Sequence, residues 1–215
     1  MPPRQATPRA PRHATALAHL TAADPVLGAW IARAGPYGLR VARAGTHFDH
    51  VARSIVYQQL SGAAAATIHG RVLALFGGTA PTPRQLLRMP DDRLRGVGLS
   101  GRKVEYLKDL AAAAARPSHP IHRLHELSDD EVIAVLTAVR GIGEWTAQMV
   151  LMFRLGRADV LPTLDLGIQK GVQRLYGLRS LPTPEQVARR GARWAPYRTI
   201  ASWYLWRRVD TTDLW

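Results

Sequence analysis

The chain has 215 residues, no cysteine and a formal net charge of +13 at pH 7. This length suits one full core or two closely packed subdomains, and the missing thiols exclude disulfides, a thiol nucleophile, Cys-ligated zinc and a thiolate-held iron–sulfur cluster. The positive charge favours a polyanionic partner, nucleic acid ahead of an anionic membrane. No apolar run in the sequence approaches the ~20 residues of a membrane span. We therefore expect a cytoplasmic protein, nucleoid-associated if prokaryotic, with no membrane partner.

The N-terminal segment differs in composition from the rest of the chain. Residues 1–16 hold four prolines, three arginines and no acidic residue, which predicts a disordered basic tail.

Helix signals dominate the remaining sequence. Asp24 followed by Pro25 predicts an N-cap with proline in the first turn. Capping boxes are predicted to start at Thr82, Ser128 and Thr183. Further helices are expected over residues 47–59, 62–76 and 102–115, and residues 37–42 are the one segment that could form a strand. The predicted fold is all-α, with about nine or ten helices.

A Gly-x-Gly turn joins two of these helices. Residues 136–149 read L-T-A-V-R-G-I-G-E-W-T-A-Q-M, and Gly141 and Gly143 leave room for a phosphate against the backbone. The next helix begins at once, and its free N–H groups and dipole attract anions without reading base sequence. The same turn also serves as an ordinary helix connection.

Phosphate contacts are predicted at two helix starts. One set lies at the Gly-x-Gly turn, and the other lies after Gly98, where a solvated basic face is the alternative. The predicted contacts are Gly141, Gly143, Glu144 and Thr146 in the first set, and Ser100 and Lys103 in the second.

Five stretches together carry a family resemblance. The helical hairpin and the run D-V-L-P-T-L-D-L-G-I-Q-K-G over residues 159–171 are the specific ones. I-V-Y-Q-Q-L-S over residues 55–61, G-L-S-G-R-K over residues 98–103 and the aromatic C-terminus support them. With these motifs the chain resembles the helix-hairpin-helix DNA glycosylases, and within them the 3-methyladenine DNA glycosylase II branch, over roughly residues 24–208.

The resemblance implies a domain organisation. Two helical subdomains should flank a cleft, one of about residues 17–50 plus 170–215 and the other of about residues 51–169, with the hairpin at 129–155.

The resemblance assigns the catalytic role to Asp165. A fixed carboxylate at this place would stabilise positive charge on the sugar as the N-glycosidic bond breaks, and could orient the attacking water. The alternative is a helix N-cap, a position that Asp often occupies. For Asp159, in the same loop, we favour a capping role.

Trp145 distinguishes two chemistries. Lyase-competent members of the superfamily have at this hairpin position a Lys that forms a Schiff base with the sugar. Tryptophan here predicts a monofunctional enzyme, and its ring face would attract a cationic alkylated base. The alternative is a Trp packed between helices. The resemblance places the base pocket at Trp145, Met149, Trp206 and Tyr57. For Trp203 and Tyr204, the sequence does not distinguish a place in the pocket from packing in the core.

Two further features come from the resemblance. Gln59, with Leu60 beside it, occupies the position of the wedge that fills the gap left by a flipped base in the minor groove. The hairpin would hold a monovalent cation, Na⁺ or K⁺, through the backbone carbonyls of Thr137, Val139 and Ile142, while catalysis would need no cofactor.

The leading hypothesis is a monomeric, monofunctional DNA glycosylase that acts on double-stranded DNA containing alkylated bases of the 3-methyladenine and 7-methylguanine type in base excision repair. The first alternative is a non-catalytic helix-hairpin-helix DNA-binding protein, and Asp165 within its motif argues against it. A glycosylase/lyase of the endonuclease III type conflicts with Trp145 and with the missing cluster cysteines, and a basic membrane-surface protein lacks a basic amphipathic stripe.

Overall fold

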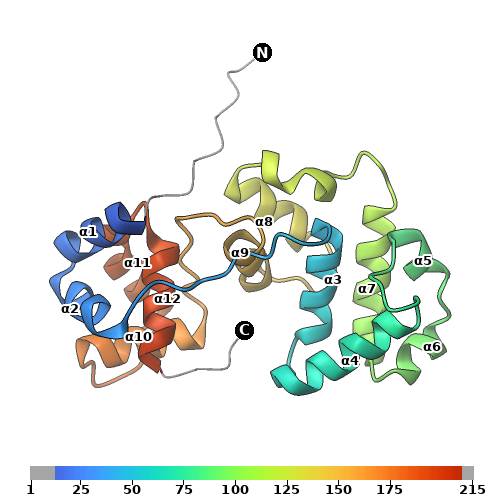
Figure 1. Cartoon of the computed structure of the whole chain (residues 1–215), viewed down its shortest axis with the longest axis horizontal. Helices are drawn as coiled ribbons and strands as arrows, with labels where there is room; N and C mark the ends of the chain where they lie inside the picture. The colour runs from blue at the N-terminus through green and yellow to red at the C-terminus, as the bar shows by residue number, and fades with distance from the viewer. Residues whose placement is uncertain (1–12, 210–215) are drawn as a thin grey trace, which may run out of the picture. The chain divides into compact units, whose positions relative to one another are not determined.

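A computed structural model describes residues 13–209 (Figure 1). Every regular element in this range is a helix, which confirms the predicted all-α fold. The described residues form twelve α-helices and two 3₁₀ helices, more than the nine or ten predicted, because short helices separated by a few residues give little periodicity of their own. Residues 37–42 run without strand pairing, so the strand prediction is wrong.

The predicted tail is only partly covered by the structure. Residues 1–12 lie outside the described range. Residues 13–16 belong to the first helix and Ala16 is fully buried, so the assignment of these four residues to a disordered tail is wrong. The apolar contact of Ala16 explains the difference, since burial stabilises a helix that composition alone does not reveal.

The described residues divide into two compact units, which are treated separately below. Unit 1 holds residues 13–41 and 151–209, so it combines two segments that lie far apart in the sequence. Its helices are α1 (His13–Ala23), α2 (Pro25–Ala34), α10 (Leu166–Tyr176), α11 (Pro184–Gly191), the 3₁₀ helix η2 (Ala192–Trp194) and α12 (Arg198–Val209).

Unit 2 holds residues 42–150. Its helices are α3 (His47–Tyr57), α4 (Gly62–Ala74), α5 (Pro83–Arg88), α6 (Asp91–Gly96), α7 (Gly101–Ala114), the 3₁₀ helix η1 (Pro120–Glu126), α8 (Asp129–Thr137) and most of α9 (Glu144–Phe153). No helix within residues 13–209 is both long and apolar enough to cross a membrane.

The predicted helix starts are confirmed where a side chain caps the helix locally. The side chains of Thr82, Ser128 and Thr183 each accept a hydrogen bond from the backbone N–H three residues on. The side chain at that third position in turn accepts one from the backbone N–H of the cap residue. Ser61 and Ser100 cap α4 and α7, and each side chain accepts a hydrogen bond from the backbone N–H three residues on. These bonds satisfy N–H groups that have no partner within the helix.

Asp24 links three parts of unit 1 from a buried position. One carboxylate oxygen accepts from the Leu27 N–H at the start of α2, 3.1 Å away. The other accepts from the Trp194 indole, 2.9 Å away, and from the Tyr176 hydroxyl. Burial alone would raise the pKa of Asp24, but these hydrogen bonds and the charge of Arg193 outweigh it and hold the pKa below 3.8.

Replacement of Asp24 by Asn should remove this charge while keeping an N-cap. We expect the Asp24→Asn variant to lose about 2 kcal/mol of stability at pH 7, or roughly 4–8 °C in Tm. A lowered carboxyl pKa stabilises the folded state above the unfolded pKa, and this contribution is lost as the pH falls through the folded pKa. Thermal unfolding at several pH values should therefore show the two proteins converging below about pH 3.8, whereas a constant difference would contradict the assignment.

Candidate functional site

Asp165 stands at the start of α10 in unit 1. Its Oδ1 atom accepts a hydrogen bond from the Ile168 N–H, 2.8 Å away, and another from the Trp206 indole N–H, 2.9 Å away. The first bond confirms the N-cap geometry. The second joins α10 to α12 and fixes the carboxylate from outside its own helix, which an ordinary N-cap does not require.

Trp206 is held between Asp165 and a second ring. It is 5% exposed and stacks on Phe153, with 5.9 Å between ring centroids. The resemblance placed Trp206 on the wall of the base pocket, a role that stays a prediction, and the structure shows that its N–H binds the candidate catalytic carboxylate. Because the indole is itself immobilised, its hydrogen bond defines the position of that carboxylate.

Two glycines of the D-L-G-I-Q-K-G run allow α12 to approach α10. A Cβ atom on Gly167 would lie 2.8 Å from Cδ1 of Trp206 and 2.9 Å from Oδ1 of Asp165. A Cβ atom on Gly171 would lie 2.5 Å from the Leu205 carbonyl oxygen. Both positions therefore need a residue without a side chain for steric reasons.

Leu164 and Leu166 flank Asp165 and are both exposed, at 58% and 52%. Sequence reasoning missed them, although their alternation with Asp165 is visible in the motif. The two leucines leave apolar surface on either side of the candidate catalytic carboxylate.

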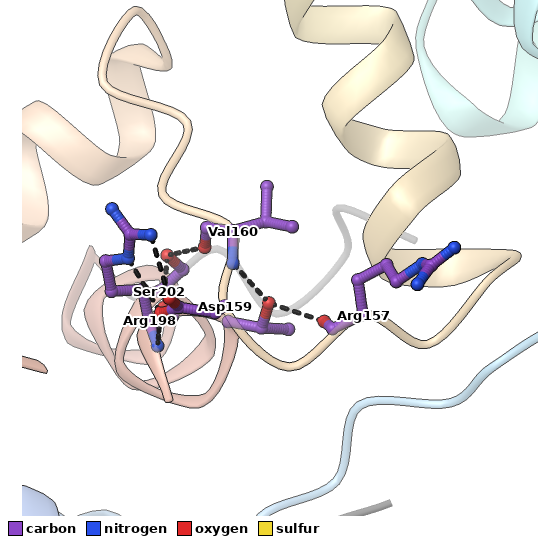
Figure 2. A network of polar contacts seen from close by, with 6 residues as sticks. Arg157, Asp159, Val160, Arg198 and Ser202 are labelled. Carbon is purple, nitrogen blue, oxygen red and sulfur yellow. Dashed lines mark hydrogen bonds and ion pairs between the residues drawn. The ribbon is translucent and has the colours of Figure 1, made fainter. Parts of the chain in front are cut away.

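The loop that leads to Asp165 is tied to the first turn of α12, as Figure 2 shows. Asp159 accepts from the backbone N–H of Arg198 and forms a two-point ion pair with its guanidinium, at 2.7 and 2.8 Å. Thr199 adds bonds to the Arg157 carbonyl and from the Val160 N–H. These contacts confirm the capping role predicted for Asp159.

The Gly-x-Gly turn joins α8 to α9 in unit 2. Gly141 has a φ angle of +81°, a conformation that favours glycine. The turn closes with a hydrogen bond from the Ile142 N–H to the Val139 carbonyl, 3.1 Å away. Gly143 and Glu144 are exposed where α9 begins, as a phosphate contact requires. Thr146 is buried, and its predicted phosphate contact stays a prediction.

The wedge loop (residues 58–61) connects α3 to α4 in unit 2. Gln59 has a φ angle of +56° and is the one non-glycine residue with positive φ in the described chain. Such backbone strain persists only where its surroundings impose it and is frequent at functional sites. Gln59 and Leu60 are both exposed, as a side chain that enters a groove must be.

Helix α7 contacts both the wedge loop and the Gly-x-Gly turn. The Lys103 ammonium donates to the carbonyls of Val56 and Gln58, each at 2.7 Å, and burial lowers its pKa. The Lys103 ammonium thus binds protein carbonyls, and its predicted phosphate contact stays a prediction, as does that of Ser100.

The same helix also contacts the Gly-x-Gly turn. Tyr106 packs on Gly141, and Asp109 accepts a hydrogen bond from the Arg140 N–H at 2.9 Å. Sequence reasoning missed Tyr106 and Asp109, because no local pattern signals these long-range contacts.

The other three residues predicted to line the base pocket differ in exposure and in their contacts. Trp145 is 37% exposed, whereas Met149 on the same helix is buried. The Arg53 guanidinium lies 4.0 Å from the Tyr57 ring centroid, and His69 meets that ring edge-on. Burial and the charge of Arg53 lower the pKa of His69. A base contact by Trp145, Met149 or Tyr57 stays a prediction.

The carbonyls predicted to hold a monovalent cation lie at the end of α8 and in the turn after it. Thr137 is the last residue of α8, where carbonyls lack partners within the helix. The Val139 carbonyl accepts one hydrogen bond and has a second lone pair. Backbone carbonyl oxygens are a ligand type that a monovalent cation accepts, and binding of such an ion by Thr137, Val139 and Ile142 stays a prediction.

Comparison with known proteins relates the whole arrangement to one family. The family described as "HhH-GPD superfamily base excision DNA repair protein" matches residues 52–196. DNA-3-methyladenine glycosylase 1 of Schizosaccharomyces pombe is 37% identical over 168 residues, which cover 77% of this chain and 74% of that protein.

Two solved structures share the fold. The first is the S. pombe 3-methyladenine DNA glycosylase Mag1 in complex with abasic DNA, with a TM-score of 0.80 and 34% identity over 93% of this chain and 98% of that one. The second is a DNA-3-methyladenine glycosidase from Bacillus halodurans, with a TM-score of 0.83 and 39% identity over 91% of this chain and 89% of that one.

Replacement of Gly167 by Ala should displace Trp206 from Asp165. The added Cβ would lie under 3 Å from both side chains, so we expect a loss of about 1–3 kcal/mol and a shift of the Trp206 indole N–H resonance. Thermal unfolding and ¹⁵N NMR measure the two effects. Gly70→Ala is the matched control, since a Cβ on Gly70 in α4 would meet nothing within 4 Å and should not destabilise the helix. Equal behaviour of the two variants would disprove the steric role of Gly167.

Proposed function

We propose that this chain, which belongs to the HhH-GPD superfamily of base excision DNA repair proteins, is a monofunctional DNA glycosylase that hydrolyses the N-glycosidic bond of alkylated bases. The observation that carries the proposal is Asp165, held at the start of α10 by hydrogen bonds from Ile168 and Trp206. The names of the relatives support 3-methyladenine-type purines as substrates.

The role of Asp165 follows from the charge that develops in the reaction. The bond between C1′ of the sugar and the base nitrogen breaks, and its electron pair leaves with the base. Positive charge then builds on the sugar, where a preorganised carboxylate stabilises it. Water forms the new bond to C1′ and loses a proton to Asp165 or to solvent, so the product is an abasic site and a free base.

Trp145 matches the chemistry of an alkylated base. Methylation on a ring nitrogen makes the base cationic, so it leaves as a neutral molecule without protonation by the enzyme. The half-exposed Trp145 ring offers a face that attracts such a cation. A tryptophan cannot form a Schiff base with the sugar, so strand cleavage is not expected.

Double-stranded DNA is the proposed partner, bound by a monomer. The net charge of +13 favours a polyanion, and the exposed start of α9 presents N–H groups suited to a phosphate. The relative Mag1 was solved in complex with abasic DNA, which supports the same mode of binding here.

The Asp165→Asn variant separates the charge of this residue from its structural role. Asparagine remains a good N-cap and can accept both hydrogen bonds, so the variant should fold and bind DNA. We expect release of methylated purines from duplex DNA to fall by at least about 10²-fold. Strands treated with native protein should break only after alkali.

The control for this experiment is Asp92→Asn, an equal loss of charge at an exposed position in α6, which should keep full activity. A native protein that binds DNA but frees no base would instead identify a non-catalytic helix-hairpin-helix DNA-binding protein. Nicking without alkali would overturn the interpretation of Trp145.

The Trp145→Ala variant tests the attraction of a cationic base. A cation–π contact of about 1–2 kcal/mol predicts that single-turnover release of 3-methyladenine falls by roughly 5- to 30-fold, while Trp145→Phe has an intermediate rate. Binding of duplex DNA with an abasic-site analogue should change by less than about 2-fold, since no base is present to stack. Unchanged release by Trp145→Ala would exclude the ring from the base pocket.

A further inference from the structure

The wedge loop and the Gly-x-Gly turn are directly joined in unit 2. The side-chain amide of Gln58 donates to the Gly141 carbonyl at 2.9 Å, although 83 residues separate them in sequence. Gln58 is half-buried and immediately precedes the exposed wedge positions Gln59 and Leu60. One side chain therefore connects the predicted groove-entering loop with the predicted phosphate-binding turn.

Helix α7 supports both sides of this connection. Lys103, Tyr106 and Asp109 are spaced three residues apart, so they lie along one side of the helix. Lys103 holds the Val56 and Gln58 carbonyls, and Asp109 holds the Arg140 N–H. The Tyr106 ring packs so closely on Gly141 that a Cβ there would lie 2.1 Å from it. One side of the helix therefore contacts both segments.

The backbone of the wedge loop shows the effect of this support. Gln58 is extended, with φ −53° and ψ 133°, and Gln59 then turns into the left-handed region at φ +56°. The left-handed conformation disfavours residues with a side chain. It places Gln59 and Leu60 outward, while the Gln58 carbonyl and amide both point to protein partners.

We propose that Gln58 is a positioning residue that holds the wedge loop at a set place relative to the phosphate-binding turn, so that binding of the backbone determines where the wedge enters the duplex. This inference rests on the proposed function. The physical reason is that extrusion of a base loses stacking, which only a wedge at the vacated position can offset. A loop that moved independently of the phosphate contact would reach that position less often.

The test compares binding to two duplexes of the same sequence, one undamaged and one with a tetrahydrofuran abasic-site analogue. Gln58→Met keeps the length of the side chain but removes the donor. We expect its affinity for the abasic duplex to fall about 3- to 10-fold, with less than about 2-fold change for undamaged DNA. Gln173→Met, a half-buried glutamine in α10 of unit 1, is the matched control and should change neither.

A double-mutant cycle in a background that carries both Gln59→Ala and Leu60→Ala distinguishes positioning of the wedge from a general structural effect. If Gln58 acts through the wedge, then Gln58→Met should have less than about a 2-fold effect once both wedge side chains are truncated. An equal loss on both duplexes, or a full loss in the background without the wedge side chains, would overturn the inference. If Gln58→Met does not fold, then Gln58→Asn, which is too short to reach Gly141, serves in the same cycle.

The native protein separates this inference from the function on which it rests. A native chain that releases methylated bases and prefers the abasic duplex, with the preference retained in Gln58→Met, overturns the role of Gln58 alone. A native chain that neither releases a base nor prefers the abasic duplex overturns the proposed function together with the positioning role.

Discussion

The close approach of α10 and α12 is the constraint on which the candidate catalytic centre depends. The Asp165 carboxylate can receive the Trp206 N–H only because Gly167 has no side chain between them, and Gly171 extends the same contact by one turn. The hydrogen bond gives Asp165 a second fixed point besides its own helix. A carboxylate held in this way needs little reorganisation when positive charge forms nearby, and preorganisation of this kind contributes much of the catalysis by electrostatic sites.

The contacts around α7 apply the same principle to DNA binding in unit 2. There the groups to be fixed are two loops, and the bonds come from Gln58, Lys103 and Asp109. Loops that carry function are usually the mobile parts of a protein. Here one helix and one glutamine contact both loops. In the proposed role, these contacts direct the energy of phosphate binding to a particular place on the duplex.

The sequence predicted the features that depend on neighbours a few residues away. The caps at Asp24, Thr82, Ser128 and Thr183 are all present, because a capping side chain and its N–H partner lie within one turn. Predictions from neighbouring residues were wrong where burial or pairing with distant residues determines the secondary structure. Residues 13–16 are helical because Ala16 is buried, and residues 37–42 have no strand partner, although their composition would allow one.

The same distinction between local and long-range contacts applies to the candidate site. The sequence by itself determined that Asp165 starts a helix, that position 145 holds Trp and not Lys, and that Gly141 lies in the turn after α8, since residue type and short spacing suffice for each. Only the tertiary structure decided that Trp206 donates to Asp165 and that Gln58 reaches Gly141, across 41 and 83 residues. Contacts at such separations depend on how helices pack, and no periodicity or capping rule in the sequence contains that information.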